Sequence, residues 1–215
     1  LREKFGLPER FVLVSARFIE KKNIPNLIQA YSSALKRVYN GPDLVILGDG
    51  PDRETILRTI ADKKLEGRVH LHGFRGYDIL PSYYGLSEGL VHVSKSEQWG
   101  LVINEAMAAA LPVLASNRCG AARTMIKNDV NGLLTEPDVE SIAEALVKLF
   151  SLSVQKRVEI GRAAQETVFK WGPDRFGVGL RDAVQSVKGS VPSRPSILER
   201  VIFGYLSRKV ISQVS

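Results

Sequence analysis

The sequence predicts an α/β fold: a Rossmann-like parallel sheet of about six strands with helices on both faces. Short runs of apolar and β-branched residues alternate with longer segments whose apolar residues recur at helical spacing. This βαβα succession is typical of a mostly parallel sheet between two helical layers. The 215 residues are 44% apolar and 25% charged, so the chain can bury a core of ordinary size.

Each element follows from its local pattern. The strands are expected at residues 11–16, 43–47, 68–71, 89–93, 113–116 and 133–135. Helices are expected between them at 24–40, 52–65, 77–85, 101–111 and 121–128. Further C-terminal helices are expected at 138–151, 154–170 and 174–187, where Asp138 or Pro137 marks a start and Gly172-Pro173 a break.

Composition and charge exclude several function classes. With one cysteine and three histidines, the chain offers no Cys/His cluster at zinc spacing, and it fits a reducing cytoplasm. The formal net charge is +7, but residues 188–215 hold five basic side chains against one acidic, which accounts for +4. The body is therefore nearly balanced, and we expect no nucleic-acid partner.

Ligands of such folds bind beyond the carboxyl ends of the strands, so the loops that leave the strands are where a site is expected. A nicotinamide-binding G-x-G-x-x-G would need glycine at position 53 after Gly48 and Gly50, but Arg53 stands there. The P-loop pattern G-x-x-x-x-G-K-[ST] is also absent. The commonest dinucleotide and phosphoryl-transfer sites are thereby excluded.

The most specific stretch runs from Ser94 to Ser116. It places two carboxylates, Glu97 and Glu105, on either side of a Trp99-Gly100 turn that begins a helix. The first amides of that helix, on Leu101 and Val102, favour a phosphate through their unsatisfied donors and the helix dipole. Carboxylates beside them would accept hydrogen bonds from sugar hydroxyls. A sugar nucleotide presents both groups.

The same residues resemble a known family. Glu97 and Glu105 have the Glu-x7-Glu spacing of retaining glycosyltransferases, and the stretch around them resembles family 4, which has the GT-B architecture of two Rossmann-like domains. Arg17 with Lys22-Asn23 is similar to that family's Arg…Lys-Asn loop, and residues 48–51 and 131–134 resemble two of its turns. The motifs occur in the family's order over roughly residues 10–187.

The resemblance implies that residues 1–188 form the C-terminal, donor-binding half of a GT-B enzyme, without the N-terminal acceptor domain. Such an enzyme moves a sugar from a nucleoside-diphosphate sugar to a glycan or lipid-linked acceptor, and the isolated half is expected to bind the donor without transferring it. No metal or other cofactor is expected. Position by position, the resemblance puts Arg17 and Lys22 on the diphosphate. The amides of Leu101 and Val102, which follow Gly100, would also contact phosphate. Glu97 would contact the donor sugar, Glu105 the ribose, and the backbone around Phe74 the base. Of these, Arg17, Lys22 and Glu97 would serve catalysis.

Departures from the family pattern bear on the donor sugar. Gln98 and Ala110 stand where the family usually has glycine, and residues 120–124 differ from its Gly-Gly-x-x-Glu. Two other functions remain open at this point: a GT-B relative such as a sugar-nucleotide epimerase, and a non-catalytic module that keeps the nucleotide-sugar cleft.

The remaining candidates are assigned to structure. His70 and His72 share one strand face and could meet His92, but no accompanying carboxylate or cysteine makes a metal site, so core or cleft-lining roles are expected. Cys119, Trp99 and Trp171 are expected to pack, and Asp49 to shape a turn. Residues 189–215 are predicted to be a linker and a basic amphipathic helix, suited to an anionic membrane surface, the missing domain or a partner chain. This tail would allow a cytoplasmic protein to lie peripherally at a membrane.

Overall fold

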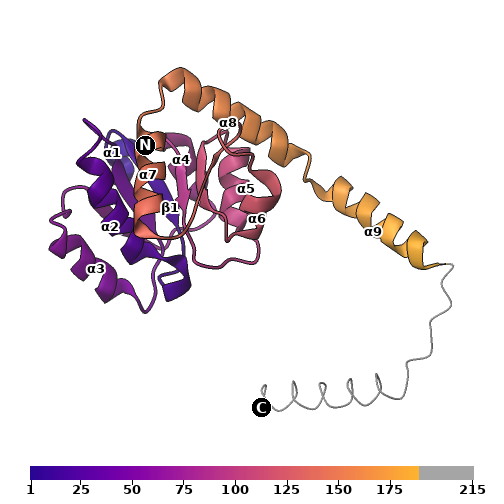
Figure 1. The fold of residues 1–215 in the computed structure, drawn as a ribbon, viewed down its shortest axis with the longest axis horizontal. Helices are drawn as coiled ribbons and strands as arrows, with labels where there is room; N and C mark the ends of the chain where they lie inside the picture. Colours follow the sequence, from indigo (N-terminus) through magenta and orange to yellow (C-terminus); the bar gives the residue numbers. More distant parts are fainter. Residues whose placement is uncertain (189–215) are drawn as a thin grey trace, which may run out of the picture. The chain divides into compact units, whose positions relative to one another are not determined.

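A computed structural model describes residues 1–188 of the chain. Its centre is one sheet of six parallel strands in the order β3-β2-β1-β4-β5-β6, which confirms the predicted fold class. Figure 1 shows β1 and its neighbours among the surrounding helices. The strands are β1 (Phe11–Ser15), β2 (Asp43–Leu47), β3 (Val69–Gly73), β4 (Leu90–His92), β5 (Val113–Ser116) and β6 (Leu133–Thr135).

The strand order reverses between β1 and β4, which are adjacent in the sheet. The first three strands run outward from β1 to one edge, and the last three run from β4 to the other. The loops that leave β1 and β4 therefore diverge to opposite faces at their carboxyl ends. Open α/β sheets place their ligands at such a reversal.

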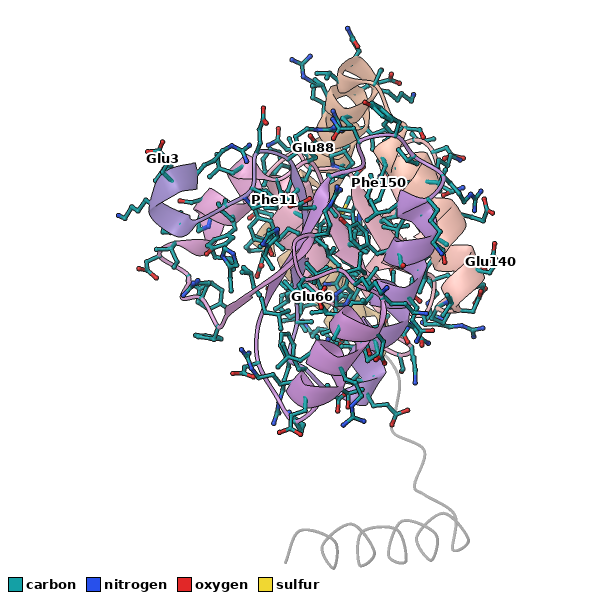
Figure 2. The ribbon with its side chains drawn as sticks, turned by 90° about the vertical axis from the view of Figure 1, so that its left-hand side faces the viewer. Glu3, Phe11, Glu66, Glu88, Glu140 and Phe150 are labelled. Carbon is teal, nitrogen blue, oxygen red and sulfur yellow. The ribbon has the colours of Figure 1, made fainter. Side chains whose placement is uncertain are left out.

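Alternate side chains of each strand enter two separate cores, one on each face of the sheet. On β1, Val12 and Val14 pack on one face, and Phe11 and Leu13 pack on the other. Phe11 lies among the strands in Figure 2, whereas Glu140 lies at the outside. Burial on both faces explains why the inner strands are mainly apolar runs, whereas the edge strand β3 alternates Val69 and Leu71 with His70 and His72.

Helices cover both faces. One core is closed by α2 (Ile24–Leu35), α3 (Arg53–Asp62) and α7 (Val139–Phe150). The other is closed by α4 (Leu80–Leu86), α5 (Leu101–Ala108), α6 (Gly120–Met125) and α8 (Val154–Phe169). Two short elements were not predicted: α1 (Arg2–Phe5) and the 3-10 helix η1 (Glu20–Lys22). Asp138 accepts a hydrogen bond from the Ser141 amide and begins α7, as predicted.

Several predicted helices are shorter in the structure. The segment 77–85 becomes helical only at Leu80, because residues 76–79 form a turn that precedes Pro81. The segment 101–111 ends at Ala108, because Ala110 adopts a left-handed φ of 56°. A Cβ added to Gly161 would lie only 1.9 Å from the Ala110 carbonyl oxygen, so α8 can pack this closely against the turn only at a glycine.

The chain divides into two compact units after Gly172. The helix α9 (Pro173–Val187) belongs to the second unit. The domain boundary at residue 188 stays a prediction. On α9, Phe176, Leu180, Val184 and Val187 recur at helical spacing and are exposed. The predicted tail at 189–215 lies outside the described residues. No helix within residues 1–188 is long and apolar enough to cross a membrane.

Candidate functional site

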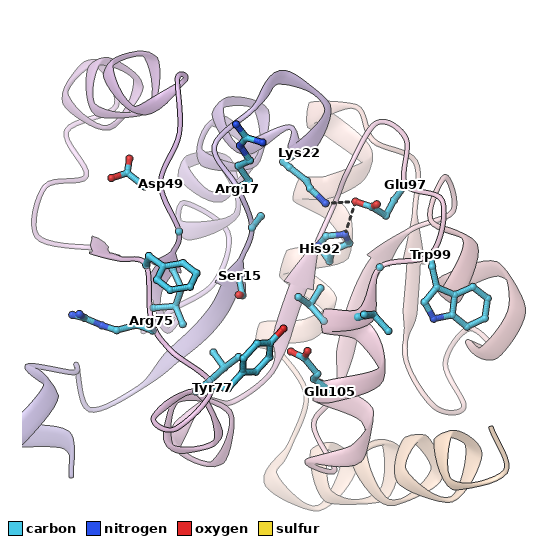
Figure 3. A pocket seen from close by; sticks show the side chains of 18 of the residues that line it. Ser15, Arg17, Lys22, Asp49, Arg75, Tyr77, His92, Glu97, Trp99 and Glu105 are labelled. Atoms are coloured by element: carbon cyan, nitrogen blue, oxygen red, sulfur yellow. Dashed lines mark hydrogen bonds and ion pairs between the residues drawn. The ribbon is translucent and has the colours of Figure 1, made fainter. Parts of the chain in front are cut away.

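A cavity of about 850 Å³ opens at the carboxyl ends of β1 to β4, at the point where the strand order reverses. The loops after β1, β2, β3 and β4 supply its walls, and α5 closes one side (Figure 3). All eight predicted site residues line this cavity: Arg17, Lys22, Phe74, Glu97, Gly100, Leu101, Val102 and Glu105. The structure therefore brings them together, and their individual roles stay predictions.

The Lys22 ammonium donates a hydrogen bond to the Glu97 carboxylate, and the two side chains are only 14% and 13% exposed. Figure 3 shows this pair bridging the loops after β1 and β4. Asn23 fixes the Lys22 loop in place: its backbone is left-handed at φ 63°, and its buried amide donates to the carbonyls of Val93 (3.0 Å) and Pro137 (2.7 Å). The lysine is thus held against the end of β4 by a second, neutral set of bonds.

The loop that carries Glu97 is tied to the loop before α6 through its backbone. The Glu97 amide donates to the Arg118 carbonyl (3.2 Å), and the Gly120 amide donates back to the Glu97 carbonyl (3.1 Å). A Cβ on Gly120 would lie 2.0 Å from the Gln98 carbonyl oxygen, so the two loops can approach this closely only at a glycine. The Glu97 side chain therefore projects from a fixed backbone.

His92 lies beside Glu97 and lines the cavity, one of the two roles expected for it, although it was not named among the site residues. It is 3% exposed, and its Nε2 lies 3.2 Å from the Ser94 hydroxyl and 3.9 Å from the Glu97 carboxylate. Burial, and then the charge of Lys22, lower the pKa of His92 to about 4, so the imidazole is neutral near pH 7. The available signal was its position as the last residue of a buried strand, where side chains face the ligand loops.

The Glu97 carboxylate is ionised. Burial alone would raise its pKa, but the hydrogen bond and charge of Lys22, together with the charge of Lys21, hold the pKa below its ordinary value. A negative group thus persists in the cavity at neutral and mildly acidic pH.

Positive potential gathers around the same end of the cavity. Gly100, at φ 96°, begins α5, and the amides of Leu101 and Val102 lie in the first helical turn, where they have no partner within the helix. Arg17 is exposed on the loop after β1, next to Phe18, whose amide is held by the Asp49 carbonyl at 2.9 Å. Arginine, lysine and a helix N-terminus together make a binding site for phosphate groups.

The opposite end of the cavity is aromatic and carries the second carboxylate. Phe74 and Tyr77, on the loop after β3, are 79% and 83% exposed. Glu105, on α5, accepts a 2.6 Å hydrogen bond from the hydroxyl of Tyr84, another residue that the sequence reasoning missed. This end of the cavity thus combines hydrogen-bond acceptors with exposed aromatic rings.

The other candidates have structural roles. His70 contacts the Asp43 carboxylate (2.8 Å) and His72 contacts the Tyr83 hydroxyl (3.1 Å), so the three histidines do not converge. Within residues 1–188, no group of three or more His, Cys, Asp or Glu side chains could hold a metal ion.

The predicted packing residues are buried or paired. Cys119 is fully buried, and burial raises the pKa of its thiol to about 11. Trp99 packs on Trp171 with ring centroids 5.9 Å apart. Asp49 accepts from the Gly50 amide at 2.8 Å and shapes its turn.

Comparison with known proteins identifies a family. The family sequence model described as "Glycosyl transferases group 1" matches residues 1–167. A GDP-mannose-dependent alpha-(1-6)-phosphatidylinositol monomannoside mannosyltransferase of Mycobacterium tuberculosis is 30% identical over 191 residues, which cover 85% of this chain and 49% of the relative. The alpha-D-kanosaminyltransferase of Streptomyces kanamyceticus is 32% identical over 153 residues, covering 69% of this chain and 39% of the relative.

A solved structure has a similar fold. The crystal structure of the Anabaena protein HepE in complex with UDP matches with a TM-score of 0.73 and 25% sequence identity, over 86% of this chain and 51% of that one. The chain thus spans about half the length, or less, of the relatives it matches.

Proposed function

Since the chain belongs to the group 1 glycosyl transferases, a family with the GT-B architecture, we propose that it is the donor-binding half of a retaining hexosyltransferase. The enzyme would move a sugar from a nucleoside-diphosphate sugar to a glycan or lipid-linked acceptor. One observation carries the proposal: Arg17, Lys22, Glu97, Glu105 and the N-terminus of α5 line one cavity at the reversal of strand order.

The cavity supplies each group that the donor needs. The diphosphate would bind between Arg17, Lys22 and the first amides of α5, where opposite charge and free donors meet. The ribose would lie on Glu105, and the base toward Phe74. The transferred sugar would then lie near Glu97, between the phosphate end and the open mouth.

The same residues support the chemistry. In the transfer, the bond between the anomeric carbon and the diphosphate would break, and a bond to the acceptor oxygen would form on the same face of the sugar. The proton of the acceptor hydroxyl would pass to an oxygen of the leaving diphosphate. Arg17, Lys22 and the α5 amides would stabilise the negative charge that grows on the leaving diphosphate. We propose that these cations replace a metal ion in that role. The Glu97 carboxylate would stabilise the positive charge that grows on the sugar ring.

The acceptor would bind in a second domain, outside this donor-binding half. The relatives are about twice as long, and the family resemblance places an acceptor-binding domain before the donor half. Without that domain, nothing orients an acceptor against the bound donor, so the isolated chain should bind but not transfer. A named relative acts on a phosphatidylinositol mannoside, which supports a lipid-linked acceptor and a peripheral position at the cytoplasmic membrane surface.

Calorimetry on the 215-residue chain tests the proposal. Titration with UDP, GDP and ADP, and with their glucose or mannose conjugates, should show saturable binding of at least one nucleotide and its conjugate. Release of nucleoside diphosphate and sugar products should be absent until the acceptor domain is restored. If none of these ligands bound, the proposal that the chain recognises a sugar-nucleotide donor would be wrong. If the isolated chain transferred sugar, the proposal that transfer needs the acceptor domain would be wrong.

A further inference from the structure

Glu105 is held from behind by a residue that does not line the cavity. Tyr84, on α4, is 4% exposed, and its hydroxyl donates a 2.6 Å hydrogen bond to Oε2 of Glu105 on α5. Glu105 lines the cavity and Tyr84 does not. The bond therefore reaches the carboxylate from the protein interior.

This phenol can act only as a donor to Glu105. Burial, followed by the hydrogen bond and charge of Glu105, raises the pKa of Tyr84 far above its ordinary value, so the proton stays on the tyrosine. A hydrogen bond to an ionised acceptor is also stronger than one between neutral groups. The long glutamate side chain is therefore fixed in one orientation, with one oxygen occupied.

The neighbouring tyrosines do not duplicate this contact. The Tyr83 hydroxyl contacts His72 (3.1 Å) and Arg75 (3.0 Å) instead. Tyr77 extends toward Glu105 in Figure 3, but it is 83% exposed and lies on the open side of the cavity. Tyr84 is thus the buried tyrosine that sets the direction of the Glu105 carboxylate.

We propose that Tyr84 is a positioning residue that, by fixing Glu105, makes this cavity select ribonucleoside diphosphates over their 2′-deoxy counterparts. A ribose presents two neighbouring hydroxyl donors, and the free acceptor sites of a fixed carboxylate accept them in one geometry. A 2′-deoxyribose leaves one of those sites unpaired, and a carboxylate held by Tyr84 cannot turn to recover the lost bond. The inference rests on the proposed function, which places the ribose on Glu105.

The test compares dissociation constants for UDP, GDP or ADP, whichever binds, and for the matching 2′-deoxynucleoside diphosphate. The wild-type chain should prefer the ribose form by about tenfold or more, the value of one charge-assisted hydrogen bond. Tyr84→Phe removes only the hydroxyl, and it should lower this preference by about threefold or more. In the Glu105→Gln background, Tyr84→Phe should produce no further change, because it acts through the carboxylate.

Tyr31→Phe is the matched control. Tyr31 is fully buried and donates to the Pro42 carbonyl (2.8 Å) at the amino end of β2, remote from the cavity. The Tyr31→Phe variant should retain the wild-type ribose preference. Thermal unfolding curves identify a temperature at which all variants are folded, and binding is measured there. If Tyr84→Phe left the preference for ribose over 2′-deoxyribose unchanged, Tyr84 would have only a structural role. That result would overturn this inference and leave the proposed function standing. Binding without ribose preference in the wild type would also overturn it, whereas absence of nucleotide binding would overturn the proposed function as well.

Discussion

The two ends of the parallel strands use the same charged residue types in different ways. The side of the sheet where the strands begin is called the amino edge, and the side where they end is called the carboxyl edge. At the amino edge, Glu88 accepts hydrogen bonds from Arg10 (2.6 Å) and Arg157 (2.5 Å), and Asp43 contacts Arg68 and His70. These charges satisfy one another and join neighbouring loops. At the carboxyl edge, the Lys22–Glu97 pair faces the cavity, together with Arg17.

The direction of the strands explains the difference. In a parallel sheet all carboxyl ends lie on the same side. Because the strand order reverses between β1 and β4, the loops that follow these two strands separate there and leave room between them. At the amino ends, side chains close that room. A cluster of charges thus becomes a candidate site through its position relative to strand direction, and residue type alone does not distinguish the two edges.

The largest expected effect is the response of the carboxyl edge to acid. His92 has a pKa of about 4 in the folded chain against about 6.5 when unfolded. Its contribution to stability is therefore complete above pH 6.5 and is lost as pH falls toward 4, by on the order of 3 kcal/mol. Thermal or urea unfolding from pH 7.5 to 4 should show a shallower loss for His92→Gln than for the wild type, and parallel curves above pH 7. Identical slopes below pH 6.5 would contradict a buried neutral histidine.

Loss of a cation at the carboxyl edge should come next. Lys22→Ala and Arg17→Ala should each weaken a nucleoside diphosphate by about 2 kcal/mol and the parent nucleoside much less, because the bonds lost are to phosphate. Calorimetry at two salt concentrations measures both effects. Arg10→Ala is the amino-edge control and should leave affinity unchanged. Equal losses for nucleoside and diphosphate would remove these residues from the phosphate site.

The amino edge should respond in stability and not in binding. Glu88→Gln leaves Arg10 and Arg157 without their shared carboxylate in a half-buried position, which should cost about 1.5 kcal/mol of the free energy of unfolding. Urea titration measures this loss. A change in nucleotide affinity in the same variant would break the functional division between the two edges.

The smallest expected effect separates the two glutamates of the cavity. Glu97→Gln should weaken a sugar nucleotide by about 1 kcal/mol relative to the free diphosphate, which should bind as well as before or better, because Lys22 no longer has a carboxylate competitor. Glu105→Gln should weaken both ligands alike. Paired titrations of one nucleotide and its sugar conjugate measure the difference. Parallel losses from Glu97→Gln would place that residue on the nucleotide or in the scaffold.

The fold was predictable because its signals are local. Five of the six strands are mainly apolar runs, whereas the edge strand β3 alternates apolar residues with His70 and His72. The observed strands lie within two residues of the predicted ends. Helix ends were harder to predict from the sequence, because tertiary contacts determine where each helix ends. The left-handed turn at Ala110 ends α5 against Gly161, about 50 residues later in the chain.

The site was predictable to the level of its lining residues, since motifs mark the ligand loops. For His92 the sequence predicted only a core or cleft-lining role, and it did not single out Tyr84, because each resembles an ordinary core residue in sequence. Their importance arises from contacts with Glu97 and Glu105, which lie on other elements. No sequence spacing encodes such a contact across the fold.

The pairing of Trp99 with Trp171 has an optical consequence. These are the only two tryptophans in the chain, and Trp99 also lines the cavity. All of the protein's indole emission therefore originates beside the candidate site, where a bound base or a shift of the Glu97 loop would change its intensity or wavelength. The chain thus contains its own fluorescent probe of occupancy, and ligand screening needs no attached label.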